Sequence, residues 1–535
     1  MAASPRRGWT TLTATVIFLV VVRSQAQTQT PLVGAIRWDA WQEGGTVNAA
    51  VEATLGPEHW HHRLPFFSQV LAPSSVHIDG NHQSIMDQEI IYAANAGINY
   101  WAFVTYPDGL GMSNGLHLYL NSPQKGLIDF CLILQGGWIS DPSSWNTQVE
   151  RYVSYFRDSK YQNVLGNRPL VYLFDVQSMI GSGKYADWSA AHAAFDQLRS
   201  AAIARGLGSP YVVIQGWNAA TDKTNMQNIG ADAIGAYAVG GGTTGGSPYA
   251  TLAASAHNFW ESDKTTGANV VPIITAGWDN RPRAENPTPW DAGSWNYFQA
   301  PAATELTSHV ADALAWTGAN CAAAPANTAL IYAWNEHDEG GWISPTLNSA
   351  TSASDTTRLD AVQTAIARVT AHGSLLNTSF ETPSATSGWY IVPTDGMPAA
   401  FGWSTNLASG SYVLATSSAL HFSKAADGSQ ALLLGASRSI SQTLGPTVAD
   451  TFYSLKFSLL HDNYNGGAGG TIRAEILDCG NIIGAGDFSV PRKRNSWQTY
   501  ALTAKSPHAP AGHLTIKFTG TSGMPWLDSV SLSPP

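Results

Sequence analysis

From about residue 31 to 372, the chain alternates short apolar runs with segments of helical periodicity. Eight runs are apolar over nearly their whole length, which is typical of strands buried on both faces of a parallel sheet. They are residues 33–39, 98–105, 128–135, 169–175, 211–216, 232–238, 270–277 and 329–335. Strands of this kind alternating with helices indicate an α/β domain.

The segments between these runs have helical patterns. One apolar stripe has the spacing i, i+3, i+4, i+7, at Val149, Tyr152, Val153 and Phe156. Asp187 is placed to cap another helix, and further helices are expected at 83–96, 248–263, 302–317 and 355–371. Eight strand–helix units predict a (β/α)8 TIM barrel over residues 31–372. An open doubly wound sheet is the alternative, but no glycine-rich loop follows the first run. Pro272 interrupts the seventh run.

The pattern changes near Gly373. Beyond it, long helical patterns give way to short alternating stretches separated by Gly, Ser, Asn and Pro, for example at 453–460, 471–477, 497–502 and 514–518. Such stretches predict an antiparallel β-sandwich of the jelly-roll type over residues 374–535.

The N-terminus has the features of an export signal. Arg6 and Arg7 precede an apolar run at 12–22, and Ser24 and Ala26 supply small residues for cleavage. We therefore expect a signal peptide at 1–26 and a secreted or periplasmic protein, with a membrane anchor as the alternative reading. No other segment has the length and apolarity of a membrane span.

Composition narrows the classes of partner. Only 12% of residues are charged and the net charge is −10, which disfavours binding to nucleic acid or to anionic membranes. The chain carries 20 Trp and 19 Tyr, whose flat faces suit sugar rings as well as large cores. An odd number of cysteines excludes a complete disulfide framework. Cys131 lies in an apolar run and is expected to be a buried thiol.

The chemical signal is strongest where the eighth strand ends. Glu336, Asp338 and Glu339 lie within four residues, between two tryptophans. In a (β/α)8 barrel, active sites form at the carboxyl ends of the strands. Glycosidic bond cleavage needs two carboxyl groups, one to donate a proton and one to act as base or nucleophile. We therefore predict Glu336 and Glu339 as catalytic residues; the alternative is a solvated acidic turn.

Polar and aromatic residues recur at the ends of the other strands. Because these ends meet at one rim, we expect substrate contacts from a set that also includes the neighbours of the two glutamates. The set is Trp38, Asp39, Trp41, Tyr106, Trp138, Trp217, Asn218, Tyr237, Trp278, Asp279, Trp334, Asn335, His337, Asp338 and Trp342.

The segment AWNEHDEGGW (333–342) resembles the Trp-Asn-Glu-x-x-Glu-Gly signature of glycoside hydrolase family 99-like and WbsX-like barrels. GAIRWDAW, GINYWAFVTY and YQNVLGNRPLVYLF resemble the same group more weakly. The resemblance implies a retaining mechanism in which Glu336 deprotonates the sugar 2-hydroxyl to form a 1,2-anhydro sugar, while Glu339 is the acid and then the base. Asp338 and the second glycine depart from the usual signature, so an ordinary two-carboxylate scheme stays open.

In the second domain, LLNTSFETP and WLDSVSL resemble the first and last strands of galactose-binding-like modules. That resemblance implies a carbohydrate-binding module and a structural calcium, with Glu381 and Asp528 as oxygen donors if the terminal strands are adjacent. Trp389, Trp403 and Tyr412 are further candidates for sugar contacts. We expect no cofactor for catalysis.

Together these features predict a secreted glycoside hydrolase acting on a polysaccharide or oligosaccharide. One alternative is a glycosyltransferase of the WbsX type, although nucleotide-sugar donors are cytosolic and the export signal argues against it. A non-catalytic glycan-binding protein is the other.

Overall fold

The computed structural model describes residues 30–139, 141–181, 184–348, 351, 353–370, 375–385, 388–391, 401–405, 413–416, 424–461, 469–491 and 496–533. The predicted signal peptide and Tyr412 lie outside these residues. Within the described part of the chain, no helix combines the length and apolarity needed to cross a membrane.

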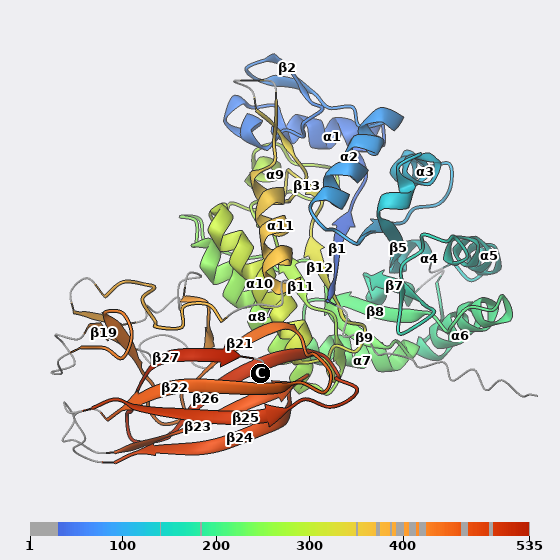
Figure 1. The fold of residues 1–535 in the computed structure, drawn as a ribbon. Helices are drawn as coiled ribbons and strands as arrows, with labels where there is room; N and C mark the ends of the chain where they lie inside the picture. Colours follow the sequence, from blue (N-terminus) through green and yellow to red (C-terminus); the bar gives the residue numbers. More distant parts are fainter. Residues whose placement is uncertain are drawn as a thin grey trace, which may run out of the picture.

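Parallel strands form the first half of the molecule (Figure 1). Their hydrogen-bonded order is β10-β9-β8-β7-β5-β4-β1-β12-β11. They are β1 (Leu32–Arg37), β4 (Tyr100–Val104), β5 (Asp129–Gln135), β7 (Arg168–Phe174), β8 (Tyr211–Gly216), β9 (Ala233–Ala236), β10 (Asn269–Val270), β11 (Ile273–Thr275) and β12 (Thr328–Tyr332).

The sheet closes through β10 and β11, which are two parts of one interrupted strand. β10 pairs with β9, and β11 pairs with β12. Proline has no N–H to donate to a ladder, so the strand is broken at Pro272. Its neighbours remain joined across the break, because Val271 donates to the carbonyl of Ile234 at 3.0 Å and Leu330 donates to that of Pro272 at 2.9 Å. The predicted eight-stranded (β/α)8 architecture is confirmed.

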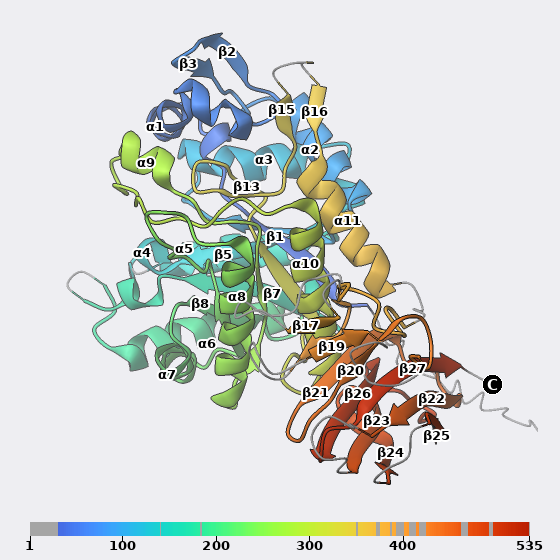
Figure 2. The ribbon, with the colours of Figure 1, turned by 90° about the vertical axis from the view of Figure 1, so that its left-hand side faces the viewer.

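Helices surround the barrel (Figure 2), and α2, α5, α6, α8, α10 and α11 lie where the sequence predicts them. Asp187 caps α6 by accepting from the Ala190 N–H at 2.9 Å, as expected. The helices are α1 (Thr46–Leu55), α2 (Gln83–Asn95), α3 (Asn114–Asn121), α4 (Gly136–Ile139), α5 (Trp145–Phe156), α6 (Trp188–Ala204), α7 (Ala219–Ile229), α8 (Tyr249–Thr265), α9 (Arg281–Glu285), α10 (Ala303–Ala319) and α11 (Thr357–Thr370).

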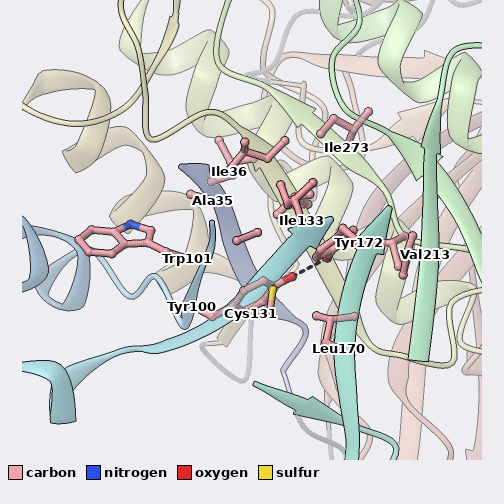
Figure 3. Close-up of a cluster of buried hydrophobic side chains, with 14 of the residues drawn as sticks. Ala35, Ile36, Tyr100, Trp101, Cys131, Ile133, Leu170, Tyr172, Val213 and Ile273 are labelled. Atoms are coloured by element: carbon pink, nitrogen blue, oxygen red, sulfur yellow. Dashed lines mark hydrogen bonds between the residues drawn. The ribbon is translucent and has the colours of Figure 1, made fainter. Parts of the chain in front are cut away.

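Tyrosine and aliphatic side chains fill the barrel interior (Figure 3). The Tyr100 hydroxyl lies 2.8 Å from the hydroxyls of both Tyr172 and Thr328. These residues belong to β4, β7 and β12, so the contacts run across the barrel. Cys131 on β5 is a buried free thiol, as predicted, and burial raises its pKa well above the usual value. The interior is therefore a packed core and not a channel.

The second half is a sandwich of two antiparallel sheets, which confirms the predicted β-sandwich. The sheets have the orders β17-β19-β20-β27-β22-β25 and β18-β21-β26-β23-β24. Their strands are β17 (Trp389–Ile391), β18 (Ser404–Thr405), β19 (Val413–Thr416), β20 (Gln430–Leu433), β21 (Ser439–Pro446), β22 (Phe452–Leu460), β23 (Gly470–Asp478), β24 (Asn481–Val490), β25 (Gln498–Lys505), β26 (His513–Ser522) and β27 (Trp526–Ser533). Trp403 is buried in the core between these sheets.

The sandwich packs against the amino-terminal ends of the barrel strands (Figures 1 and 2). A disulfide joins Cys321, just after α10, to Cys479, just after β23, with Cα atoms 5.5 Å apart. A cavity of about 400 Å³ lies at this junction, between the starts of β1 and β12 and the segment 510–513. The sandwich therefore leaves the opposite, carboxyl ends of the strands uncovered.

The helices α7 and α8 each carry a buried carboxyl group, Asp222 and Asp263. Asp263 is fully buried and neither of its oxygens has a hydrogen-bond partner. Burial, aided by the charge of Asp222, raises the pKa of Asp263 to about 8. Burial also raises the pKa of Asp222 to about 6. Both groups are far along the chain from the acidic cluster of 336–339, and they affect stability in their own right.

Replacing Asp263 by Asn should make the protein more stable at alkaline pH. The folded carboxyl holds its proton up to about pH 8, whereas an unfolded one releases it near 3.9. Folding stability therefore falls as the pH rises between these values, by about 1.4 kcal/mol per pH unit. The amide of the Asp263→Asn variant cannot ionise, so its thermal midpoint should exceed that of the wild type by several degrees at pH 8 and converge with it at pH 4. Calorimetry between pH 4 and pH 8 measures the thermal midpoints, and Asp196→Asn, at an exposed position, is the control. If the midpoint depends on pH in the same way in the wild type and both variants, the prediction is wrong.

Candidate active site

The acidic segment forms a tight hairpin at the carboxyl end of β12. β13 (Asn335–Glu336) pairs with β14 (Gly341–Trp342). The turn between them includes Gly340, whose φ of 82° and close approach to the Asp279 backbone leave no room for a Cβ. The Asn335 amide donates to the Trp38 carbonyl at 2.8 Å and accepts from its N–H at 3.0 Å. The hairpin is thereby fixed to the end of β1.

Glu336 is almost completely buried, with 3% of its surface exposed. One oxygen accepts from the Tyr237 hydroxyl at 3.2 Å, and the other has no hydrogen-bond partner. Burial raises the pKa of Glu336 well above its usual range, and the nearby charge of Glu339 raises it further. Desolvation and like charge both disfavour the anion of Glu336 and favour its protonated form.

Glu339 has a different environment. One of its oxygens accepts from Arg283, and the other accepts from the Tyr332 hydroxyl. Burial raises the pKa of Glu339, but the charge of Arg283 opposes that rise. Its side chain is 14% exposed, so it is the more accessible of the two glutamates.

Arg283 on α9 also pairs with Asp338, whose carboxylate accepts from the arginine Nε at 2.7 Å. Arg283 pairs with Asp291 as well, at 3.2 Å. Three carboxyl groups thus contact one guanidinium, and Glu336 makes no ion pair with it. The charge of Arg283 opposes the rise in the pKa of Glu339, which it contacts directly, whereas burial and the charge of Glu339 raise the pKa of Glu336. The arrangement gives the two glutamates different tendencies to ionise, which acid–base catalysis requires.

Aromatic side chains surround the pair. The Trp38 indole donates to the Tyr106 hydroxyl at 2.7 Å, and the Tyr106 ring lies 6.0 Å from that of Trp138. The rings of Tyr237 and Trp278 lie 5.8 and 5.9 Å from the Tyr332 ring. These predicted contacts therefore lie around the site, while Trp217 is exposed at the end of β8.

Other residues expected to contact substrate are buried structural groups. Trp334 packs 5.0 Å from Trp101 and donates to Glu89, and Asp39 pairs with Arg37 at 2.7 Å. The indole of Trp41 donates to the Asn335 carbonyl at 2.9 Å. Burial raises the pKa of Asp39 to about 6. These side chains, and that of Asn335, have structural partners, and direct substrate contact by them stays a prediction.

A second group supports the hairpin from behind. His337 lies 2.7 Å from the Arg63 carbonyl and stacks on Trp342, and burial lowers its pKa to about 3, so it stays neutral. Asp279 pairs with Arg63 and Arg281, which hold its pKa below the usual value despite burial.

The side chains of Asn218 and Asp338 also have partners within the protein. Asn218 caps α7 by accepting from the Thr221 N–H at 3.0 Å, and Asp338 forms an ion pair with Arg283. Like His337, Trp342 and Asp279, they have structural partners, and contact of these residues with the substrate stays a prediction.

Sequence analysis missed several groups that contact Glu339 or the aromatic side chains around the two glutamates. Arg283 and Tyr332 bind Glu339, and Phe174 packs 4.6 Å from Tyr237. Trp290 packs 6.0 Å from Trp38. Tyr332 and Phe174 end barrel strands, so the rule that selected the other rim residues could have included them. Arg283 offered a weaker signal, a cation shortly after the seventh strand in a chain with few charges.

The predicted calcium ligands converge on one loop of the sandwich. Glu381 accepts from the N–H groups of Ser429 and Gln430 at 2.8 and 2.9 Å, and Asp528 accepts from that of Asp427 at 3.0 Å. These N–H donors occupy oxygens that a cation would need. Among the described residues, no group of three or more His, Cys, Asp and Glu side chains is arranged for a metal. The donor set therefore does not fit calcium by side chains alone, and the ion stays a prediction.

No family model and no curated protein sequence matches this chain. Among solved structures, a GH99 endo-alpha-mannosidase from Bacteroides thetaiotaomicron is 13% identical over 63% of this chain and 96% of its own, with a TM-score of 0.42. The cyclase Fisc from Fischerella sp. TAU is 19% identical over 30% of this chain and 97% of its own, with a TM-score of 0.26. A structure described as CBM4 is 18% identical over 30% and 100%, with a TM-score of 0.19. At these values an activity has to be argued from the site.

Proposed function

We propose that this protein is a glycoside hydrolase and that Glu336 and Glu339 are its catalytic pair. One observation carries the proposal: two electrostatically linked carboxyl groups lie on one hairpin at the carboxyl mouth of a (β/α)8 barrel, one beside a cation and one without. Hydrolysis of a glycosidic bond needs one proton donor and one ionised group beside the anomeric carbon.

Exposed tryptophans at the same mouth support a carbohydrate substrate. The four described tryptophans with the most exposed side chains are Trp138, Trp217, Trp290 and Trp295, at 44 to 61%. Each lies in a segment that follows the carboxyl end of a barrel strand. Exposed indoles are costly in water, whereas their faces suit the apolar faces of sugar rings. The substrate we propose is a polysaccharide or oligosaccharide.

The division of roles between the two glutamates has two readings. The resemblance implies Glu336 as the base that takes the 2-hydroxyl proton while O2 attacks the anomeric carbon, and Glu339 as the acid that protonates the departing oxygen. Water then opens the 1,2-anhydro sugar, giving a proton to Glu339 while Glu336 returns one to O2. The charges of the unliganded site favour the reverse, because Arg283 stabilises the Glu339 anion. For the scheme that the resemblance implies, Glu336 has to be ionised when the substrate is bound, so that it can accept the proton of the 2-hydroxyl.

Two further features belong to the proposal. A disulfide between the domains persists in an oxidising compartment, which supports export by the predicted signal peptide. The sandwich has the architecture of many carbohydrate-binding modules, and we propose that it binds glycan.

The decisive experiment is a screen of the purified chain against a glycan panel. Products are identified by mass, and the anomeric configuration of the first product is followed by NMR. Release of reducing ends supports hydrolysis, and retained configuration supports the two-step scheme. Transfer from a nucleotide sugar without hydrolysis, or binding without new products, would replace the proposal by one of its alternatives.

Trp217→Ala should weaken the turnover of long substrates selectively. The Trp217 ring packs 5.5 Å from Phe174, whose ring lies beside Tyr237, so it extends the aromatic wall outward. Loss of a stacking platform costs about 1.5–3 kcal/mol, a roughly 10- to 100-fold fall in kcat/KM for an oligosaccharide. An aryl monoglycoside should be turned over normally. The exposed Phe452→Ala in the sandwich is the control, and equal losses on short and long substrates would contradict an outer sugar site.

A further inference from the structure

Gln215 lies inside the barrel just below the site. Val213 pairs in register with Tyr172, and Gln215 pairs with Phe174. Tyr172 points into the barrel, where its hydroxyl meets that of Tyr100 (Figure 3). Residues paired in register, or two apart on one strand, share a face of the sheet. The Gln215 side chain therefore points into the barrel at the level of Phe174.

The neighbours of Gln215 connect it to the catalytic pair. On one side Phe174 packs against Tyr237, which donates to Glu336. On the other side Gln215 pairs in register with Gly235, two residues before Tyr237, where a Cβ would meet the Val271 carbonyl oxygen at 2.5 Å. Gln215 thus lies between the strands that lead to Phe174 and Tyr237.

The amide of Gln215 is buried and has no partner. Only 2% of the residue is exposed, and both its oxygen and its nitrogen lack a hydrogen bond in the described structure. Such a group is costly, because burial removes its bonds to water without replacing them. Gln135, which also pairs in register with Phe174, is satisfied by the Thr105 carbonyl at 2.8 Å. The lack of a partner is therefore specific to Gln215 and is not shared by Gln135, which lies at the same level of the barrel.

We propose that Gln215 binds two adjacent hydroxyls of the sugar held between Glu336 and Glu339, and so determines which sugar enters. This inference rests on the proposed function. An amide donates through its nitrogen and accepts through its oxygen, which matches a pair of neighbouring hydroxyls, each both donor and acceptor. A neutral amide also adds no charge to a site where several carboxyl groups already lie around Arg283. The second Glu336 oxygen, equally unpaired, also lacks a partner that a sugar hydroxyl, both donor and acceptor, can supply.

The test begins with binding, which does not need turnover. The full chain is titrated with neutral monosaccharides, their methyl glycosides and short oligosaccharides, and the sugar that raises the thermal midpoint most is carried forward. Gln215→Met, similar in volume but without the amide, should weaken its Kd at least tenfold. Gln442→Met removes a buried glutamine whose amide is satisfied in the sandwich and should leave that Kd unchanged. Equal Kd values for Gln215→Met and wild type, or no sugar that binds the wild type, overturn the proposal.

Monodeoxy analogues of the same sugar locate the contact. Wild type should lose affinity at two adjacent positions, and Gln215→Met should lose nothing further there, because the contact is already absent. If the affinity lost through Gln215→Met adds to the affinity lost through the missing hydroxyl at every position, the proposal is overturned. A thermal midpoint of Gln215→Met well below that of the wild type also overturns it, since removal of an unpaired buried amide should not destabilise the fold. Binding without cleavage, with these patterns intact, sinks the hydrolase proposal alone and leaves the role of Gln215 standing.

Discussion

Glu336→Gln and Glu339→Gln should each lower kcat by at least 10³-fold while leaving the fold intact. Removing a general acid or base lowers the rate by about 10²–10⁴-fold. Where two residues act as a unit, replacing either one removes most of the catalytic effect of both. Gln keeps the size of the side chain but cannot exchange a proton. Both variants should therefore retain the circular dichroism spectrum and thermal midpoint of the wild type to within a few degrees. Turnover within tenfold of wild type in either variant would remove that residue from the mechanism.

Aryl glycosides with leaving groups of different acidity assign the two roles. A variant that lacks the general acid should recover most of its activity on a dinitrophenyl glycoside, whose departure needs no proton, and little on a substrate with an alkoxide leaving group. A variant that lacks the base should stay slow on both. Recovery in Glu339→Gln supports the scheme that the resemblance implies. Recovery in Glu336→Gln supports the roles that the charges of the unliganded site favour.

Arg283→Met should have the second largest effect, on both stability and activity. The substitution leaves Asp338, which is fully buried, and Glu339 without their cation. Breaking a buried ion pair on one side costs about 3–5 kcal/mol, which thermal or denaturant unfolding can measure. The double variant Arg283→Met/Asp338→Asn should recover part of that loss, because one uncompensated charge is gone. No recovery would contradict the assignment of Asp338 as the partner of Arg283.

The same substitution should move the pH dependence of activity in a known direction. Arg283 lowers the pKa of Glu339, so its removal raises that pKa. The limb of the pH–rate profile that reports Glu339 should move to higher pH, whichever role the residue has. Arg283→Lys keeps the charge but not the planar guanidinium, and it should shift this limb less. An unmoved profile in Arg283→Met would mean that Glu339 does not titrate in turnover.

The barrel could be predicted from local hydrophobic patterns in the sequence. Runs of apolar residues at eight positions define strands buried on both faces, and helical stripes between them leave few other architectures. Even the break at Pro272 was visible, since proline cannot complete a ladder. The hairpin with Glu336 and Glu339 was equally accessible, because strand order alone sends the end of the eighth strand to the active mouth.

Which side chain faces the substrate was decided by tertiary packing. Trp334 and Trp217 both follow the rule for rim residues, yet the first is buried against Trp101 and the second is exposed. The reason is that orientation at a strand end depends on the twist of the hairpin and on partners far along the chain. Glu89 is 245 residues from Trp334, and no periodicity carries that information.

The sequence by itself therefore determined the elements, their order, and the pair of acids at one mouth of the barrel, since these depend on local periodicity and topology. Only the tertiary structure decided that Arg283 compensates Glu339 and leaves Glu336 without a cation, that Asp39, Asp279 and His337 support the site from behind, and that Cys321 meets Cys479. Each of these depends on through-space contact between distant segments, where burial and charge act over a few ångströms whatever the separation along the chain.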